Sequence, residues 1–237
     1  MKTKKIFFGA AMAVAAVTTL ASCGGQSGLS VCLASTPDHV DPALNSAVDG
    51  ASYAVHLFGG LVRYVPAEDG KGVKLAADLA KELPKAVKEG DKVSYTFTLK
   101  DGIKFSDGTA IEPSDFVKSW NRAASYTPGD ESPEGALDAD YNYMFEVIDG
   151  YTSLSEKDEA GTLKADDYKN FLNVTADDDA NTLKVVLPVD VPYFYELCAF
   201  PAYMVLKDAD KLPADGSWAK DPNGFVASGA YKLKSYE

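Results

Sequence analysis

The sequence predicts a fold of mixed α/β type, in which short strands and helices share one core. Apolar and polar side chains alternate over residues 93–100, which is the pattern of a strand with one buried face. The dipeptides Asp101-Gly102 and Asp107-Gly108 then predict two turns, because glycine accepts a positive φ at little cost. Over residues 113–124 apolar side chains recur at helical spacing, and Pro113 suits the first turn of a helix.

The N-terminus predicts an export signal that is not part of the fold. Residues 1–22 begin with lysines, continue as an apolar run too short for a membrane span and end in small residues. Leu20-Ala21-Ser22-Cys23 closely resembles the bacterial lipobox, which implies cleavage before Cys23 and attachment of lipid to Cys23. An ordinary secretory signal with an incidental cysteine is the alternative. Residues 23–28 are rich in glycine and predict a flexible tether.

The remainder of the chain predicts short elements separated by loops. Strands are expected at residues 29–34 and 61–64, and a hairpin at residues 173–179 and 182–187. Helices are expected at residues 49–61, 141–151 and 191–197, and residues 75–83 are helical in composition. Loops are expected at residues 35–43, 84–91, 125–140 and 207–220.

Charge and cysteine content limit the possible partners. The formal net charge is −12, and it becomes −15 without residues 1–22, which hold three of the 23 basic residues and no acidic one. An acidic chain of this kind argues against nucleic-acid partners, which require basic surfaces. After export, Cys32 and Cys198 could form a disulfide. Both lie among apolar neighbours, so buried free thiols are the default expectation.

No set of residues in the sequence predicts catalysis. The two histidines, His39 and His56, have no metal-ligand partner at the required spacing. Neither a nucleophile elbow nor a phosphate-binding glycine loop occurs. The acidic run Asp177-Asp178-Asp179 lacks the alternating ligands and closing glutamate of an EF-hand, so it is interpreted as a hydrated turn. We therefore expect no catalytic residue, no metal and no cofactor.

Several motifs together resemble one protein family. They are VDP at residues 40–42, FGGLV at 58–62, FTLK at 97–100, KFSDGT at 104–109, DFVKSWNR at 115–122 and SGAYKL at 228–233. This order closely resembles the peptide/nickel-type (family 5) solute-binding proteins of ABC importers. Residues 188–200 look like the oligopeptide-binding branch in particular. Gly59 stands where the family usually has glutamate. Residues 75–83 correspond in the family to a short turn-rich passage, which argues against a helix there.

The resemblance implies a periplasmic-binding-protein-like lobe of class II with an inserted small subdomain. Residues 29–60 would form the first pass of lobe I, residues 61–187 the inserted subdomain and residues 188–237 an incomplete second pass. Chains of this family are much longer. The second lobe is therefore expected to be absent, and the chain to be an N-terminal portion, a truncated product or one part of a two-chain protein.

The resemblance also implies a function. The chain would be a monomeric lipoprotein that captures oligopeptides outside the cytoplasmic membrane, or in the periplasm, for an ABC permease and its ATPase. A surface lipoprotein that acts as a peptide sensor or adhesin is the alternative, and a hydrolase on the same scaffold is a third. The family pattern assigns ligand contacts to Ser46, Ala47, Val48, Tyr141 with Tyr143 as its alternative, and Ser228. The competing interpretations are a plain loop for residues 46–48 and core positions for the tyrosines.

Overall fold

The computed structural model describes residues 32–33, 35–125, 137 and 139–236. The predicted signal, Cys23, the tether and most of the loop expected at residues 125–140 lie outside the described residues. Of the strand expected at residues 29–34, only Cys32 and Leu33 are described, and neither is in a strand. From Ser35 onward, the described residues form one compact unit.

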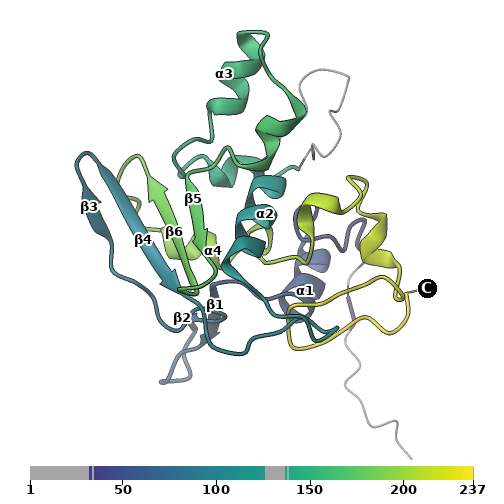
Figure 1. Cartoon of the computed structure of the whole chain (residues 1–237). Coiled ribbons are helices and arrows are strands. Elements are labelled where there is room, and N and C mark those ends of the chain that lie inside the picture. Colours follow the sequence, from purple (N-terminus) through teal and green to yellow (C-terminus); the bar gives the residue numbers. More distant parts are fainter. Residues whose placement is uncertain (1–31, 34, 126–136, 138, 237) are drawn as a thin grey trace, which may run out of the picture. The chain divides into compact units, whose positions relative to one another are not determined.

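Two antiparallel sheets and a set of short helices build this unit (Figure 1). One sheet has the strand order β3-β4-β6-β5, and the other pairs β1 with β2. The strands are β1 (Val62–Pro66), β2 (Val73–Ala77), β3 (Val87–Glu89), β4 (Lys92–Thr98), β5 (Val174–Asp177) and β6 (Thr182–Leu187). The α-helices are α1 (Val48–Leu57), α2 (Pro113–Ala124), α3 (Ser153–Glu159) and α4 (Phe194–Cys198). The described 3-10 helices are η1 (Asn142–Phe145), η2 (Ala165–Lys169), η3 (Pro201–Tyr203), η4 (Ala209–Lys211) and η5 (Ser217–Lys220).

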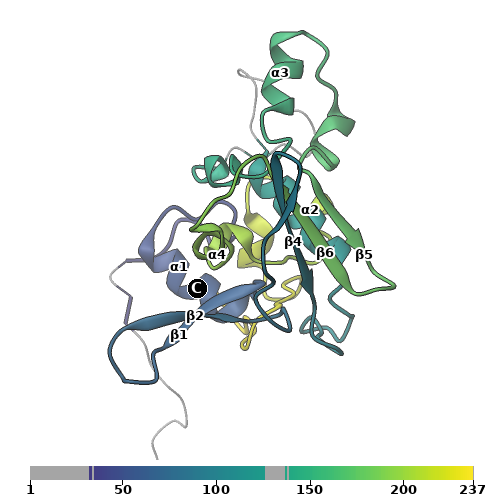
Figure 2. The ribbon, with the colours of Figure 1, turned by 90° about the vertical axis from the view of Figure 1, so that its left-hand side faces the viewer.

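Strand β4 and helix α2 confirm the expectations from the sequence pattern. In β4 the alternating residues Val93, Tyr95 and Phe97 are buried and lie opposite Leu187, Val185 and Leu183 of β6. Helix α2 packs against β5 and β6. Both views show it beside the larger sheet (Figures 1 and 2). The β5–β6 hairpin is confirmed as well, with Asn181 in the left-handed region at its turn.

Four expectations about local structure are wrong or incomplete. Residues 75–83, helical in composition, contain part of β2, because pairing with β1 satisfies their backbone. The turn expected at residues 84–91 includes the short strand β3, which pairs with β4. Helix α1 ends at Leu57, where the chain becomes extended ahead of Gly59-Gly60. The helix expected at residues 141–151 is only the 3-10 turn η1.

Of the two described cysteines, one is buried and one is exposed. Both are free thiols. Cys198 is buried as expected, and burial raises the pKa of its thiol. Cys32 is exposed, so the expectation of burial is wrong there; it precedes the compact unit that begins at Ser35.

The buried apolar side chains form two clusters. The larger one contains the inward faces of β4, β5 and β6 and the buried face of α2. The smaller one joins two distant segments of the chain, residues 40–58 and residues 204–227. Its members are Val40, Ala54, Leu57, Phe58, Met204, Leu206, Ala209, Ala219, Phe225 and Ala227.

Candidate functional site

Two of the predicted ligand-binding segments meet in the structure. The hydroxyl of Tyr141 lies 3.4 Å from the backbone oxygen of Ser46 and donates a hydrogen bond to it. Ser46 and Ala47 are exposed, and Val48 exposes 82% of its surface at the start of α1. An exposed segment at the start of α1 therefore lies beside an aromatic side chain.

Aromatic rings extend this surface beyond the predicted residues. Tyr141 contacts Tyr143 and Phe200 edge-on, with ring centroids 6.1 and 5.1 Å apart. Tyr143 is 50% exposed, while Tyr141 and Phe200 are half-buried. Phe200 was not predicted as a site residue. It ends the segment that resembles the oligopeptide-binding branch, but nothing in the local pattern distinguishes it from a core residue.

A buried tyrosine holds the two aromatic segments together. The ring of Tyr203 stacks on Phe145 with a centroid distance of 4.1 Å and an interplanar angle of 15°. Its hydroxyl donates a hydrogen bond of 2.7 Å to the backbone oxygen of Met144. Burial raises the pKa of Tyr203, so the hydroxyl stays protonated and able to donate. The 3-10 helices η1 and η3, which directly follow Tyr141 and Phe200 in the chain, are thus joined.

Ser228, the remaining predicted contact, has a different environment. Its side chain is buried, donates to the backbone oxygen of Val205 (2.7 Å) and accepts from the backbone N–H of Gly59 (3.0 Å). Both partners belong to the protein backbone, so the hydroxyl joins three segments. The next residue, Gly229, crosses the end of α1 so closely that a Cβ there would lie 2.7 Å from the backbone of Leu57.

Four consecutive residues of α2 bind three different parts of the chain. Ser119 accepts a hydrogen bond from the N–H of Leu206 (2.9 Å), and the indole of Trp120 donates to the oxygen of Tyr203 (2.8 Å). The Asn121 side chain accepts from Phe171 (2.8 Å) and Leu172 (3.1 Å), and Arg122 binds Asp41. The SWNR motif is therefore a structural junction, and it positions the aromatic segment through Tyr203.

The pair of Arg122 with Asp41 is buried and bidentate. Its two N···O distances are 2.7 and 3.3 Å, and the two side chains are 4% and 0% exposed. The Asp41 carboxylate also accepts from the indole of Trp218 (2.8 Å) and the N–H of Ala43 (3.0 Å). A buried carboxylate with four donors is well satisfied. The loop that leads to Ser46 is thereby attached to α2.

The acidic hairpin turn makes specific hydrogen bonds within the protein, where the sequence suggested only a hydrated turn. The carboxylate of Asp178 accepts a hydrogen bond of 2.9 Å from the N–H of Ser114, in the first turn of α2. Asp177 accepts one of 2.8 Å from the N–H of Ala180 within the turn. Asp178 therefore caps a helix that is distant in sequence. Among the described residues no group of histidine, cysteine and carboxylate side chains is arranged to hold a metal ion.

The KFSDGT turn is bonded to two segments that follow much later in the chain. Asp107 pairs with Lys207 and accepts from the N–H (3.0 Å) and hydroxyl (2.7 Å) of Thr109. Ser106 and Ala227 exchange two hydrogen bonds of 2.8 and 2.9 Å. The bond from Lys207 and those from Thr109 lower the pKa of Asp107 from 3.8 to about 2.

This lowered pKa predicts a contribution to acid stability. Because the folded pKa lies below the unfolded value, the stabilisation is complete above about pH 4 and is lost as the pH falls toward 2. We expect Asp107→Asn to be less stable than the original protein at pH 7, and the difference to shrink between pH 4 and pH 2. Urea unfolding midpoints at several pH values measure it. A difference that stays constant across this range would contradict the assignment.

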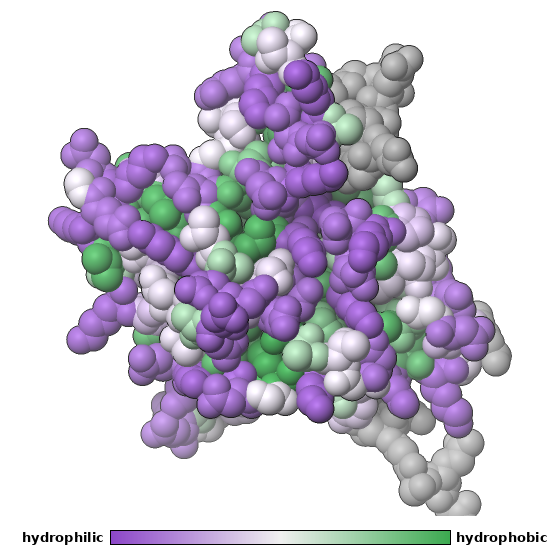
Figure 3. Space-filling model, in the orientation of Figure 1, coloured by the Kyte–Doolittle hydropathy of each residue, from purple (hydrophilic) through white to green (hydrophobic). Residues whose placement is uncertain are grey.

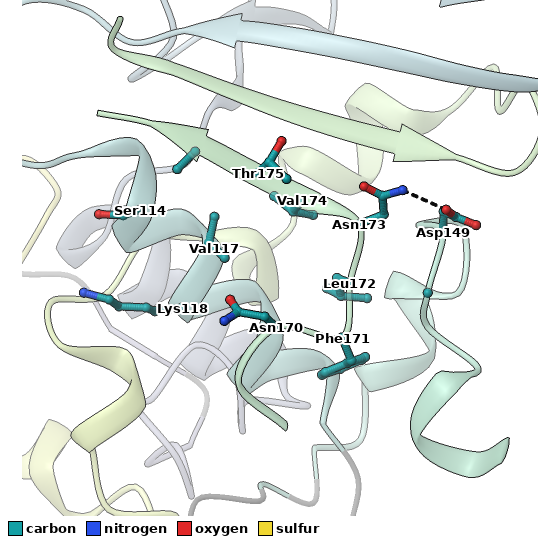
Figure 4. A pocket seen from close by; sticks show the side chains of 12 residues that line it. Ser114, Val117, Lys118, Asp149, Asn170, Phe171, Leu172, Asn173, Val174 and Thr175 are labelled. Atoms are coloured by element: carbon teal, nitrogen blue, oxygen red, sulfur yellow. Dashed lines mark hydrogen bonds between the residues drawn. The ribbon is translucent and has the colours of Figure 1, made fainter. Parts of the chain in front are cut away.

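A separate groove of about 670 Å³ lies between α2 and β5 (Figure 4). Ser114, Val117 and Lys118 line it from the helix, and residues 170–176 line it from the strand side. The side chain of Asn173 donates to Asp149 across its edge (2.8 Å). None of the predicted ligand-binding residues lines this groove. We therefore place the candidate site at the Ser46–Tyr141 contact, where exposed backbone and aromatic rings meet.

The visible surface is largely hydrophilic. On the face seen in Figure 1, hydrophobic side chains form small patches between polar ones (Figure 3). In the described part of the chain, no helix has both the length and the apolar character that a bilayer crossing needs.

Comparison with known proteins identifies related sequences and structures. The profile of the bacterial extracellular solute-binding proteins, family 5 (middle region), matches residues 74–237. The periplasmic murein peptide-binding protein MppA of Escherichia coli is 30% identical over 200 residues, which are 84% of this chain and 32% of that protein. The oligopeptide-binding protein OppA of Bacillus subtilis is 30% identical over 217 residues, covering 90% of this chain and 34% of its own length.

A solved structure confirms the fold class. The structure of the Escherichia coli murein tripeptide binding protein MppA matches with a TM-score of 0.62 and 27% identity. The match covers 86% of this chain and 35% of the other. The fold is therefore mixed α/β and periplasmic-binding-protein-like. The chain spans about a third of the length of the relatives that it matches.

Proposed function

Because the chain belongs to family 5 of the bacterial extracellular solute-binding proteins, we propose that it binds oligopeptides outside the cytoplasmic membrane. Members of this family are binding proteins rather than enzymes. Bound peptide would pass to the permease and ATPase of an ABC importer. The observation that carries the proposal is the contact between Tyr141 and Ser46, which joins two of the segments expected to meet a peptide.

The chemistry of this surface suits an extended peptide. The N–H groups of Ser46 and Val48 would pair with peptide main chain whatever its sequence, as when a strand is added to a sheet edge. Both backbone groups of Ala47 are already bonded, to Asn45 and Ala51. The rings of Tyr141 and Tyr143 offer apolar area beside that backbone. The hydroxyl of Ser228 already has two partners, so Ser228 would not contact the peptide through it. It would instead hold the backbone of Gly59 and Val205 in position.

Calorimetric titration of the mature protein with a mixture of short peptides tests the proposal. We expect binding, and we expect Tyr141→Ala to weaken it about tenfold, or 1.4 kcal/mol. Tyr64→Ala is the control, because Tyr64 is an exposed tyrosine (51%) on β1, where it lies opposite Leu75 of β2. If no peptide in the mixture binds, the proposal that the protein binds oligopeptides is refuted.

We also propose the division of the chain expected from the family. Residues 29–60 and 188–237 would form two passes of one lobe, and residues 61–187 the inserted subdomain. The smaller apolar cluster supports this division, since all of its members come from the two passes. Hydrogen exchange under mildly denaturing conditions would test it: the amides of residues 29–60 and 188–237 should lose protection together, and loss in one step with residues 61–187 would count against the division.

We propose further that residues 1–22 are removed on export and that Cys23 carries the lipid anchor. Support comes from the Leu20-Ala21-Ser22-Cys23 sequence alone. Cells grown with labelled palmitate should incorporate the label into the protein, and Cys23→Ala should abolish incorporation and release the protein from membranes. Cys32→Ala is the matched control and should change neither. Equal labelling of the Cys23→Ala variant would disprove lipidation at this residue.

A further inference from the structure

We infer that Phe200 completes a preformed aromatic subsite that selects an aromatic or large apolar side chain of a bound peptide. This inference rests on the proposed peptide-binding function and specifies its substrate class. The subsite consists of Phe200, Tyr141 and Tyr143, with the backbone of Ser46 at its edge.

The three rings are partly exposed, so a ring of the ligand could contact them. Tyr141 is in edge-on contact with both neighbours, at interplanar angles of 61° with Tyr143 and 82° with Phe200. None of the three rings is fully buried, and Tyr143 exposes half of its surface. Aromatic pairs prefer such edge-to-face or offset contacts, so a ligand ring can add to the group in the same manner.

The subsite is fixed before a ligand arrives. The N–H of Phe200 donates to the oxygen of Leu197 (2.9 Å), and its own oxygen accepts from the N–H of Tyr203 (3.0 Å). Tyr203 in turn stacks on Phe145, in the same 3-10 helix as Tyr143. Binding therefore does not require these backbone segments to become ordered, which reduces its entropic cost.

The electrostatics of the subsite disfavour acidic side chains. The faces of aromatic rings carry partial negative charge. Asp140, exposed and adjacent to Tyr141, adds a full negative charge nearby, and the chain as a whole has a formal net charge of −12. A phenylalanine side chain in the peptide should therefore bind better than a glutamate at the same position.

The inference can be tested by calorimetric titration of the mature protein. The ligands are tetra-alanine and its variants with a single phenylalanine or a single glutamate. We expect at least one phenylalanine peptide to bind more tightly than tetra-alanine and than its glutamate counterpart. Phe200→Leu keeps an apolar side chain but removes the ring, so the phenylalanine-to-alanine affinity ratio should fall about 2- to 12-fold. Tyr64→Ala should leave the ratio unchanged.

The possible outcomes separate this inference from the proposed function. A fall in the ratio with unchanged affinity for tetra-alanine supports a subsite at Phe200. Equal weakening for every peptide would show a purely structural role and overturn the inference. Peptide binding without any preference for phenylalanine would also overturn it while leaving the proposed function intact. If the protein binds none of the peptides, the proposed function itself is refuted.

Discussion

Replacing Arg122 by alanine is expected to lower the free energy of unfolding by about 3–5 kcal/mol. The change leaves the Asp41 carboxylate buried, with only Trp218 and the Ala43 N–H as partners. The cost reflects an uncompensated buried charge more than the attraction within the pair itself. Urea unfolding followed by circular dichroism measures the loss.

A double-mutant cycle shows whether the pair is responsible. Asp41→Ala and Arg122→Ala should each destabilise strongly, and the double variant should lose much less than their sum. The exposed pair of Lys169 with Asp166 is the control, and Lys169→Ala should leave the unfolding midpoint nearly unchanged. Additive losses in the cycle would show that Asp41 and Arg122 act independently.

Truncation of Trp120 is expected to cost about 3–5 kcal/mol as well, through loss of packing. The side chain is 0% exposed and contacts the rings of Phe116, Phe145 and Tyr203 at centroid distances of 6.2, 6.3 and 4.9 Å. Trp120→Ala would leave a cavity between α2 and the segment beneath the candidate site. Thermal and urea unfolding of the variant measure the effect.

Trp120→Phe separates packing from hydrogen bonding. It retains a ring but removes the indole N–H that donates 2.8 Å to the Tyr203 oxygen, a loss of about 1–3 kcal/mol. We expect the alanine variant to be clearly less stable than the phenylalanine variant. Equal stability of the two would mean that the hydrogen bond, and not the packing, is what Trp120 contributes.

Elements with a strong local pattern were predictable from the sequence. Strand β4, helix α2 and the β5–β6 hairpin lie where alternation, helical spacing and turn residues indicated. Strand β2 was not predictable in this way, because its composition favours a helix and only pairing with β1 makes it a strand. The short strand β3 depends in the same way on β4.

The candidate site was only partly predictable. Family resemblance indicated Ser46 and Tyr141, and the structure brings these two together. Phe200 could not be predicted as a site residue, because its proposed role depends on a ring contact with Tyr141, which is distant in the sequence. Ser228 resembles the other predicted residues in sequence terms, but its hydroxyl is buried between two backbone groups.

The family, the main turns and the central helix could be predicted from sequence patterns, because motifs and periodicity act over short stretches of chain. What those motifs do in the protein follows from its tertiary contacts. Arg122 binds Asp41 across 81 residues, and Tyr141 reaches Ser46 across 95. No local pattern encodes such contacts, since they depend on how the chain returns on itself to bury the apolar surface of α2 and the sheet. The motif residues of α2 thus form the junction that holds the aromatic surface in place.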